Sequence, residues 1–272
     1  MRLSRLLTYS TVFAGAILIC IPLWWMVTTS IKPSANVFTF PPELIPSKVR
    51  WQNYSDIFLL LPFVHYFKNT MVIVLFTLVG GTLSSAIVGY GFAKLRFPGS
   101  SVLFMVMLST MMIPYHTLII PHFILFKNFG WLNTYLPLIV PAFFGSPFYV
   151  FLFRQFFKSI SKEYNDAARI DGCGYFGTFL RVIVPMSMPV FGVVAIYTFN
   201  GVWNDFLGPL IYINSESKRT IQLAINALKG LHTVEWHLLM AASVCALIPS
   251  VLIFFFLQRR MIQGIVVSGI KG

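Results

Sequence analysis

The chain has 272 residues, of which 57% are hydrophobic, 17% are aromatic and only 10% are charged. Charged residues make up about a quarter of an ordinary soluble domain, so this composition excludes that class and indicates a membrane protein. The formal net charge of +12 comes from 20 Lys and Arg residues against eight Asp and Glu residues. Three cysteines lie far apart, and their spacing indicates neither a disulfide framework nor a metal site.

Six apolar runs divide the chain. Runs of about 20 residues are long enough to cross ~30 Å of hydrocarbon as helices. The predicted fold is therefore an all-α membrane protein with six transmembrane helices in a single domain, residues 1–272. The predicted spans are residues 10–29, 69–92, 101–120, 134–153, 186–206 and 238–258.

The first run also has the basic start of a signal peptide, with Arg2 and Arg5 before the apolar residues. The run continues to Val27, however, and no clear cleavage site ends it before Trp24 and Trp25. We therefore expect an uncleaved first span.

The basic residues predict the orientation. Twelve of the 20 Lys and Arg residues fall in the segments that are cytoplasmic if both termini are inside, and these segments are the shorter ones. This density follows the positive-inside rule, so the net charge is a topology signal and no nucleic-acid partner is expected. The predicted loops are a cytoplasmic loop at 158–184 and extracellular loops at 30–68, 121–133 and 207–237.

A ridge of small residues runs along the second predicted span. Gly81, Ser85 and Gly89 recur every four residues, and such a ridge lets another helix approach closely. Proline interrupts most of the other spans, which suits a tightly packed bundle that must rearrange.

The sequence lacks the residues that ATP binding through a P-loop and ion-coupled transport would require. No G-x-x-x-x-G-K-[ST] loop occurs, so the chain binds no ATP through a P-loop of its own. The acidic residues lie outside the predicted spans or at their edges, with Asp205 the borderline case, whereas ion-coupled carriers place such groups at membrane depth. A secondary carrier and a polytopic membrane enzyme stay as alternatives. The expectation is a protein without catalytic or metal site, driven by a partner.

A polar segment stands out between the fourth and fifth spans. Residues 161–171 predict a short helix, with Ser161 as N-cap and both Gly172 and Gly174 as its stop. Ala167 and Ala168 are expected to give this helix a smooth side on which another surface can lie closely. The letters GCGYFG at 172–177 match a dinucleotide fingerprint, but that fingerprint needs a preceding strand and an acidic residue about 20 positions later. Position 197 is Tyr, so the glycines are interpreted as a helix stop and turn.

The spacing in this segment resembles the "EAA" signature of the membrane subunits of bacterial ABC importers. Asp166, Ala167 and Ala168 are followed at the expected distances by Gly172 and by an apolar run that ends at Pro185. The resemblance implies a type I ABC importer permease fold, with this loop as the helix that docks on a cytoplasmic ATPase subunit. The implied ATPase-coupling residues are Glu163, Asp166, Ala167, Ala168, Gly172 and Pro185. The family has Glu at the position of Asp166 and Leu at that of Val184.

The likeness extends over nearly the whole chain, to the smaller permease subunit of maltose-transporter-type carbohydrate importers. It rests on WQNY at 51–54, WNDFLGPLIY at 203–212 and the ending QRRMIQGIVVSGIKG. It implies a binding-protein-dependent sugar permease in the bacterial or archaeal plasma membrane, with ATP and Mg²⁺ bound by the partner ATPase. The implied partners are a second, homologous permease, two ATPase subunits and an extracellular solute-binding protein. A permease for a non-sugar solute is the remaining alternative within this family.

Neutral polar residues mark one face of the fifth span. Tyr197, Asn200 and Asn204 follow helical spacing, and Trp203 lies beside them. Such groups suit a sugar in the substrate path, but hydrogen bonding between helices is the competing and favoured interpretation.

Overall fold

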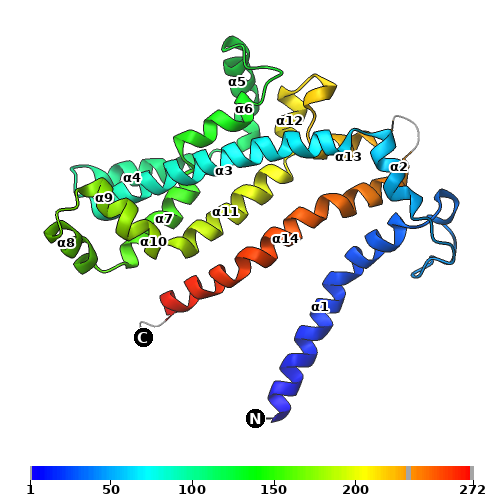
Figure 1. Ribbon diagram of the computed structural model, residues 1–272, viewed down its shortest axis with the longest axis horizontal. Helices are drawn as coiled ribbons and strands as arrows, with labels where there is room; N and C mark the ends of the chain where they lie inside the picture. The colour runs from blue at the N-terminus through cyan, green and yellow to red at the C-terminus, as the bar shows by residue number, and fades with distance from the viewer. Residues whose placement is uncertain (1, 231–233, 270–272) are drawn as a thin grey trace. The chain divides into compact units, whose positions relative to one another are not determined.

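The structure is a computed structural model that describes residues 2–230 and 234–269. Every regular element in these ranges is helical, as the sequence predicts for an all-α protein (Figure 1). The longest helices are α1 (Arg2–Ser30), α3 (Phe63–Lys94) and α14 (Trp236–Gly269). The other α-helices are α2 (Gln52–Leu60), α4 (Ser100–Ser109), α5 (Tyr115–Asn128), α6 (Leu136–Ile139), α7 (Pro147–Ser159), α8 (Lys162–Ile170), α9 (Tyr175–Thr178), α10 (Val184–Met186), α11 (Met188–Trp203), α12 (Leu207–Tyr212) and α13 (Ile221–Ala227). The described 3₁₀ turns are η1 (Ser34–Asn36), η2 (Thr110–Met112), η3 (Val140–Phe144) and η5 (Glu216–Lys218), and η4 (Phe179–Ile183) is a π-helix.

Four described segments are long and apolar enough to cross a membrane. They are Arg5–Ser30, Phe63–Lys94, Leu136–Ser159 and Trp236–Phe256. Two further candidates are bent pairs: Ser100–Met112 with Tyr115–Asn128, at 96°, and Tyr175–Met186 with Met188–Trp203, at 79°. The described chain has six spans only if each bent pair counts as one. The membrane class is thus observed, while the number six and the side of each terminus stay predictions.

Prolines account for both bends. Ile113 is extended, with ψ of 116°, because a residue that precedes proline is disfavoured in the α region. Pro114 then begins α5 as its N-cap. In the other pair, Ser187 separates α10 from α11, and its N–H donates to the carbonyl of Val184. Pro189 has no N–H and occupies the first turn of α11, where none is needed.

The chain forms two compact units. The first consists of Met1–Tyr66 and Ile221–Pro249, and the second of Phe67–Thr220 and Ser250–Gly272. The ending that resembles a permease tail continues α14 as far as Gly269, and its last residues, 270–272, lie outside the described residues.

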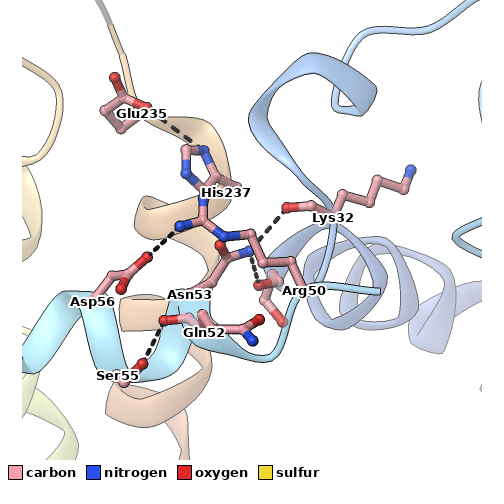
Figure 2. A network of polar contacts seen from close by, with 9 residues as sticks. Lys32, Arg50, Gln52, Asn53, Ser55, Asp56, Glu235 and His237 are labelled. Carbon is pink, nitrogen blue, oxygen red and sulfur yellow. Dashed lines mark hydrogen bonds and ion pairs between the residues drawn. The ribbon is translucent and has the colours of Figure 1, made fainter. Parts of the chain in front are cut away.

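In the first unit, Asn53 ties α2 to the chain that follows α1. Its buried amide donates to the carbonyl oxygens of Ser30 and Lys32, at 2.9 and 2.8 Å (Figure 2). The buried Lys32 ammonium in turn donates to the Glu43 carbonyl at 2.6 Å, and an ion pair of 2.9 Å joins Arg50 to Asp56 nearby. The WQNY motif therefore carries a structural task, because its Asn satisfies backbone carbonyls left open where α1 ends.

In the second unit, the small-residue ridge of α3 faces η3 and α7, as predicted. A Cβ on Gly81 would touch Ala142, and Ser85 Oγ accepts a 3.0 Å hydrogen bond from the N–H of Ser146. Gly89 lies against the backbone of α7, where a Cβ would come within 3.1 Å of the Val150 carbonyl oxygen. The absence of larger side chains brings the two elements into direct backbone contact.

Beyond Gly89, aromatic side chains form the core of the second unit. Tyr90 of α3, Phe153 and Phe157 of α7, and Phe179 and Ile183 of η4 are buried together. The ring centroids of Tyr90 and Phe179 lie 5.0 Å apart, and those of Phe153 and Phe157 lie 5.5 Å apart. Burial of such side chains stabilises the fold by about 1.5–3 kcal/mol each, so η4 is firmly attached to α3 and α7.

We predict that Gly89→Ala lowers the thermal stability of the purified protein. The new Cβ would lie 2.8 Å from Phe153 Cβ, and overpacking of this kind costs about 1–3 kcal/mol. Gly91→Ala is the matched control in the same helix, because no atom lies within 4 Å of its new Cβ. The measurement is the unfolding midpoint of each variant in detergent. Equal midpoints for the two variants would contradict the close contact.

Candidate functional site

The polar segment folds into α8 through local interactions. Ser161 is its N-cap, and its Oγ accepts a 3.3 Å hydrogen bond from the N–H of Glu163. Glu163 lies in the first turn and Arg169 in the last, so both charges complement the helix dipole. A helix precedes the glycines, whereas the dinucleotide fingerprint requires a strand. The predicted helix and its cap are confirmed.

A left-handed turn at Gly172 ends α8. Gly172 has φ of +78°, its N–H donates to the Arg169 carbonyl, and the N–H of Cys173 donates to the Ala168 carbonyl. These two bonds form a Schellman motif, which satisfies the last carbonyls of a helix. Gly174 was expected to share the stop, but its φ of −70° is ordinary and it is the N-cap of α9. The prediction was wrong for Gly174, because one left-handed residue is enough to complete the motif.

α9 leads directly into the buried core. The Tyr90 hydroxyl donates to the carbonyl of Tyr175 at 3.2 Å, where α9 begins. The chain then passes through the π-helix η4, whose Phe179 and Ile183 are buried, to Pro185 in α10. The break at Ser187 follows. The segment that connects α8 to the bent fifth span is therefore held by the Tyr90 hydrogen bond at its start and by the buried side chains of η4.

The predicted coupling residues divide between two environments. Glu163, Asp166 and Ala167 are exposed on α8, whereas Ala168 is buried. The two alanines were expected to form one smooth docking side, but they are consecutive and point in different directions. Ala168 packs inward and also accepts the Schellman hydrogen bond, so it contributes to the base of α8 and Ala167 to its surface.

The C-terminal end of α3 and the segment that follows it bring residues close to α8 that sequence spacing did not indicate. Lys94 donates to the Ile160 carbonyl at 2.7 Å, across 66 positions of the chain. Lys94 and Arg96 line a cavity of about 960 Å³ with residues of α8. The signal in the sequence was the basic character of 93–100, which also indicates a cytoplasmic segment.

On α11, the predicted polar stripe is partly exposed. Tyr197 and Asn204 are exposed and Asn200 is half-buried, and the Asn204 amide donates to the Asn200 carbonyl at 2.9 Å. Trp203 differs from them: its indole is buried, with ring centroids 5.3 Å from Phe67 and 5.4 Å from Phe199. The structure brings the first three residues to an accessible surface and gives Trp203 a packing role.

Asp205, the borderline acid of the sequence, lies just beyond the end of α11. Its carboxylate accepts a 3.1 Å hydrogen bond from the N–H of Gly208, in the first turn of α12. Burial raises the pKa of Asp205, and the hydrogen bonds from backbone N–H groups oppose that rise. Its side chain therefore supports the start of α12. The described residues contain no group of three or more His, Cys, Asp or Glu side chains that could hold a metal ion.

An exposed, capped helix joined to a bent, apolar span is the arrangement that the resemblance to an importer permease implies for the segment around 161–185. Residues 81–267 match the family of binding-protein-dependent transport system inner membrane components, and the chain belongs to that family.

Relatives and solved structures agree with this assignment. The chain is 33% identical to the arabinooligosaccharide transport system permease protein AraQ of Bacillus subtilis, over 94% of this chain and 92% of the relative. It is 30% identical to the lactose transport system permease protein LacG of Rhizobium radiobacter, over 98% and 97%. A chain of a bacterial ABC transporter that imports the acidic polysaccharide alginate has the same fold, with a TM-score of 0.82, 20% identity and coverage of 95% and 96%.

Proposed function

We propose that this chain is the permease subunit of an ATP-driven, binding-protein-dependent sugar importer. The observation that carries the proposal is α8, a short polar helix. It has Ser161 as its N-cap, a left-handed Gly172 at its end and an exposed outer surface. The family assignment and the sugar-transport names of the relatives support the substrate class. A relative named for sn-glycerol-3-phosphate, 31% identical, is a permease for a different solute, so the individual sugar is not proposed.

The proposed complex contains a second, homologous permease, two ATPase subunits and an extracellular solute-binding protein. ATP and Mg²⁺ are assigned to the ATPase subunits, because this chain has no P-loop. A solved relative of the fold, with a TM-score of 0.68, is an alginate transporter in complex with a pentasaccharide-bound periplasmic protein. That assembly supports a binding-protein partner for the present chain.

The proposed coupling path starts where the ATPase subunit grips α8. Asp166 and Ala167 are exposed there, and Glu163 lies one turn earlier. Movement of α8 would pass through Gly172 and α9 to η4, and from there through Pro185 to α11. A π-helix has an irregular hydrogen-bond pattern and often occurs at functional sites. Because η4 is held in the core, the break at Ser187 beyond it is the suitable place for α11 to change its angle.

We predict that Asp166→Ala and Gly172→Val each weaken assembly with the ATPase or uncouple ATP hydrolysis from transport. Asp166 is expected to meet a basic residue in the docking cleft of the ATPase subunit. Truncating one partner of such a buried, hydrogen-bonded charge pair costs about 2–5 kcal/mol, or roughly 30- to 4,000-fold in binding. Valine at Gly172 would have to adopt φ of +78°, which β-branched residues avoid. The controls are Asp166→Glu, which keeps the carboxylate, and Gly174→Ala, where the backbone is ordinary and no atom lies within 4 Å.

The measurement is sugar transport alongside ATPase activity in the reconstituted complex. Both controls should behave like the parent protein. Normal coupled transport by Asp166→Ala and by Gly172→Val would refute α8 as the coupling element.

The proposed topology has both termini in the cytoplasm, with 158–184 on the same side. Its support is the density of basic residues, which the positive-inside rule assigns to cytoplasmic segments. We predict that reporters fused after Gly99 and Lys158 are cytoplasmic and that a reporter after Ser217 is extracellular. Paired alkaline phosphatase and fluorescent-protein fusions measure each site, and a cytoplasmic signal at Ser217 would overturn the six-span arrangement.

The proposed substrate path follows the exposed side of α11. Tyr197, Asn200 and Asn204 supply neutral hydrogen-bonding groups there, while Trp203 packs in the core against Phe67 and Phe199. Gly201 lies on the same helix, and it lines a cavity of about 200 Å³ together with Thr198, whose buried hydroxyl has no hydrogen-bond partner in the described residues.

We predict that the double change Asn200→Leu and Asn204→Leu reduces transport, because a sugar would lose hydrogen-bond partners along the path. Assembly and basal ATPase activity should remain. The measurement is uptake by vesicles that contain the purified complex, compared with its ATPase rate. Loss of assembly in place of transport would identify both residues as packing groups and remove them from the path.

A further inference from the structure

The cavity beside α8 is lined mainly by basic side chains. Its volume is about 960 Å³, and its lining residues come from the C-terminal ends of α3 and α7, from the segments that follow them, and from α8. Five cationic side chains and a single carboxylate line it. The charged lining residues are Lys94, Arg96, Lys158, Lys162, Arg169 and Asp166.

These cations have little internal compensation. Among the residues that the structure describes, none of the five forms an ion pair within 4.0 Å. Lys94 donates to the Ile160 carbonyl, and Arg169 lies over the Tyr175 ring, 4.8 Å from its centroid. Both contacts hold a cation in position and leave its charge unneutralised, so the cavity attracts an anion.

A second observation also indicates a ligand. The Oδ1 atom of Asn165, which lines the cavity, is buried and has no hydrogen-bond partner in the described part of the chain. Buried polar atoms in folded proteins are nearly always paired, and an unpaired one costs about 1–3 kcal/mol. Asn165 as a whole is only half-buried, so a rotation of its side chain toward the cavity would let a bound molecule with hydroxyl or phosphate groups pair with the amide.

The position of the cavity selects the source of the anion. α3 and the Leu136–Ser159 segment are both candidate spans, and the cavity lies where they end. That level corresponds to the lipid headgroups, where aromatic side chains gather, and both Phe97 and the exposed Tyr175 line the cavity. Basic pockets between helix ends on the cytoplasmic side are typical sites for phosphate headgroups of anionic lipids.

We propose that this cavity binds the phosphate headgroup of an anionic phospholipid of the cytoplasmic leaflet. The proposal rests on the proposed topology of the permease. The headgroup phosphate would lie among Arg96, Lys158 and Lys162, and the headgroup hydroxyls would reach the Asn165 amide. The lipid would thereby hold α8 against the ends of α3 and α7, in the position from which it meets the ATPase subunit.

The test uses the assembled complex in nanodiscs of phosphatidylcholine alone or of phosphatidylcholine mixed equally with phosphatidylglycerol. The variant is Arg96→Gln with Lys158→Gln, because both side chains are exposed and neither is among the proposed coupling residues. The matched control is Arg5→Gln with Arg181→Gln, which removes two cations of the same predicted side that do not line the cavity. A charge-keeping variant, Arg96→Lys with Lys158→Arg, checks for effects on folding.

Native mass spectrometry and lipid titration measure phosphatidylglycerol retained by each complex. We expect the parent, the control and the charge-keeping variant to retain it, and the Gln variant to bind it roughly 30-fold more weakly, since two cations are lost. Equal retention by the Gln variant would overturn the proposal. Loss of ATPase assembly by that variant in phosphatidylcholine alone would also overturn it and would identify an acidic segment of the partner as the occupant.

Two further arms separate the remaining explanations. Inorganic phosphate is added to the complex in detergent, and stabilisation that matches the effect of phosphatidylglycerol would overturn the lipid as the source. Lipid retention is measured without sugar, so it does not depend on transport. A complex that retains phosphatidylglycerol but transports no sugar would refute the proposed function and leave the lipid site intact.

Discussion

The close contact of α3 with the Leu136–Ser159 segment is the interaction on which the rest of the second unit depends. That span is irregular, because Gly145 has φ of +83° between η3 and α7. Backbone groups freed by such a break need partners where water is absent. Ser84 donates to the Ala142 carbonyl at 3.1 Å, and Ser85 accepts from the N–H of Ser146 at 3.0 Å. Small residues on α3 therefore serve two purposes: they allow the approach, and their hydroxyls satisfy the break.

This contact also positions η4, the element to which the proposed coupling helix α8 is connected. Gly89 brings α7 close enough for Tyr90 to reach Phe157 and Phe179 at once. η4 is thereby packed on two helices, while α8 beyond it remains exposed. A rigid core next to an exposed helix suits the transmission of movement, because packed interiors shift as units and resist local compression.

The first unit shows how a motif can be diagnostic of a family and yet serve the fold. Asn53 is completely buried, and both of its amide hydrogens are used on carbonyls of the segment after α1. The Lys32 ammonium is held by a carbonyl and by the Trp25 ring, 4.6 Å from its centroid. Neither residue is available to a substrate. The Asp205 carboxylate, engaged by the backbone of α12, is a further polar group whose position follows from capping.

The sequence by itself determined the membrane class, the ridge on α3 and the ends of α8. These features depend on hydrophobic length, on helical spacing and on hydrogen bonds between near neighbours, such as Ser161 to Glu163. Only the tertiary structure decided that Ala168 is buried beside the exposed Ala167, that Trp203 belongs to the core, and that Lys94 reaches Ile160. The physical reason is that the burial of a side chain and the clustering of charges depend on contacts between elements that are far apart in the chain. A local sequence pattern does not specify which of these elements pack together.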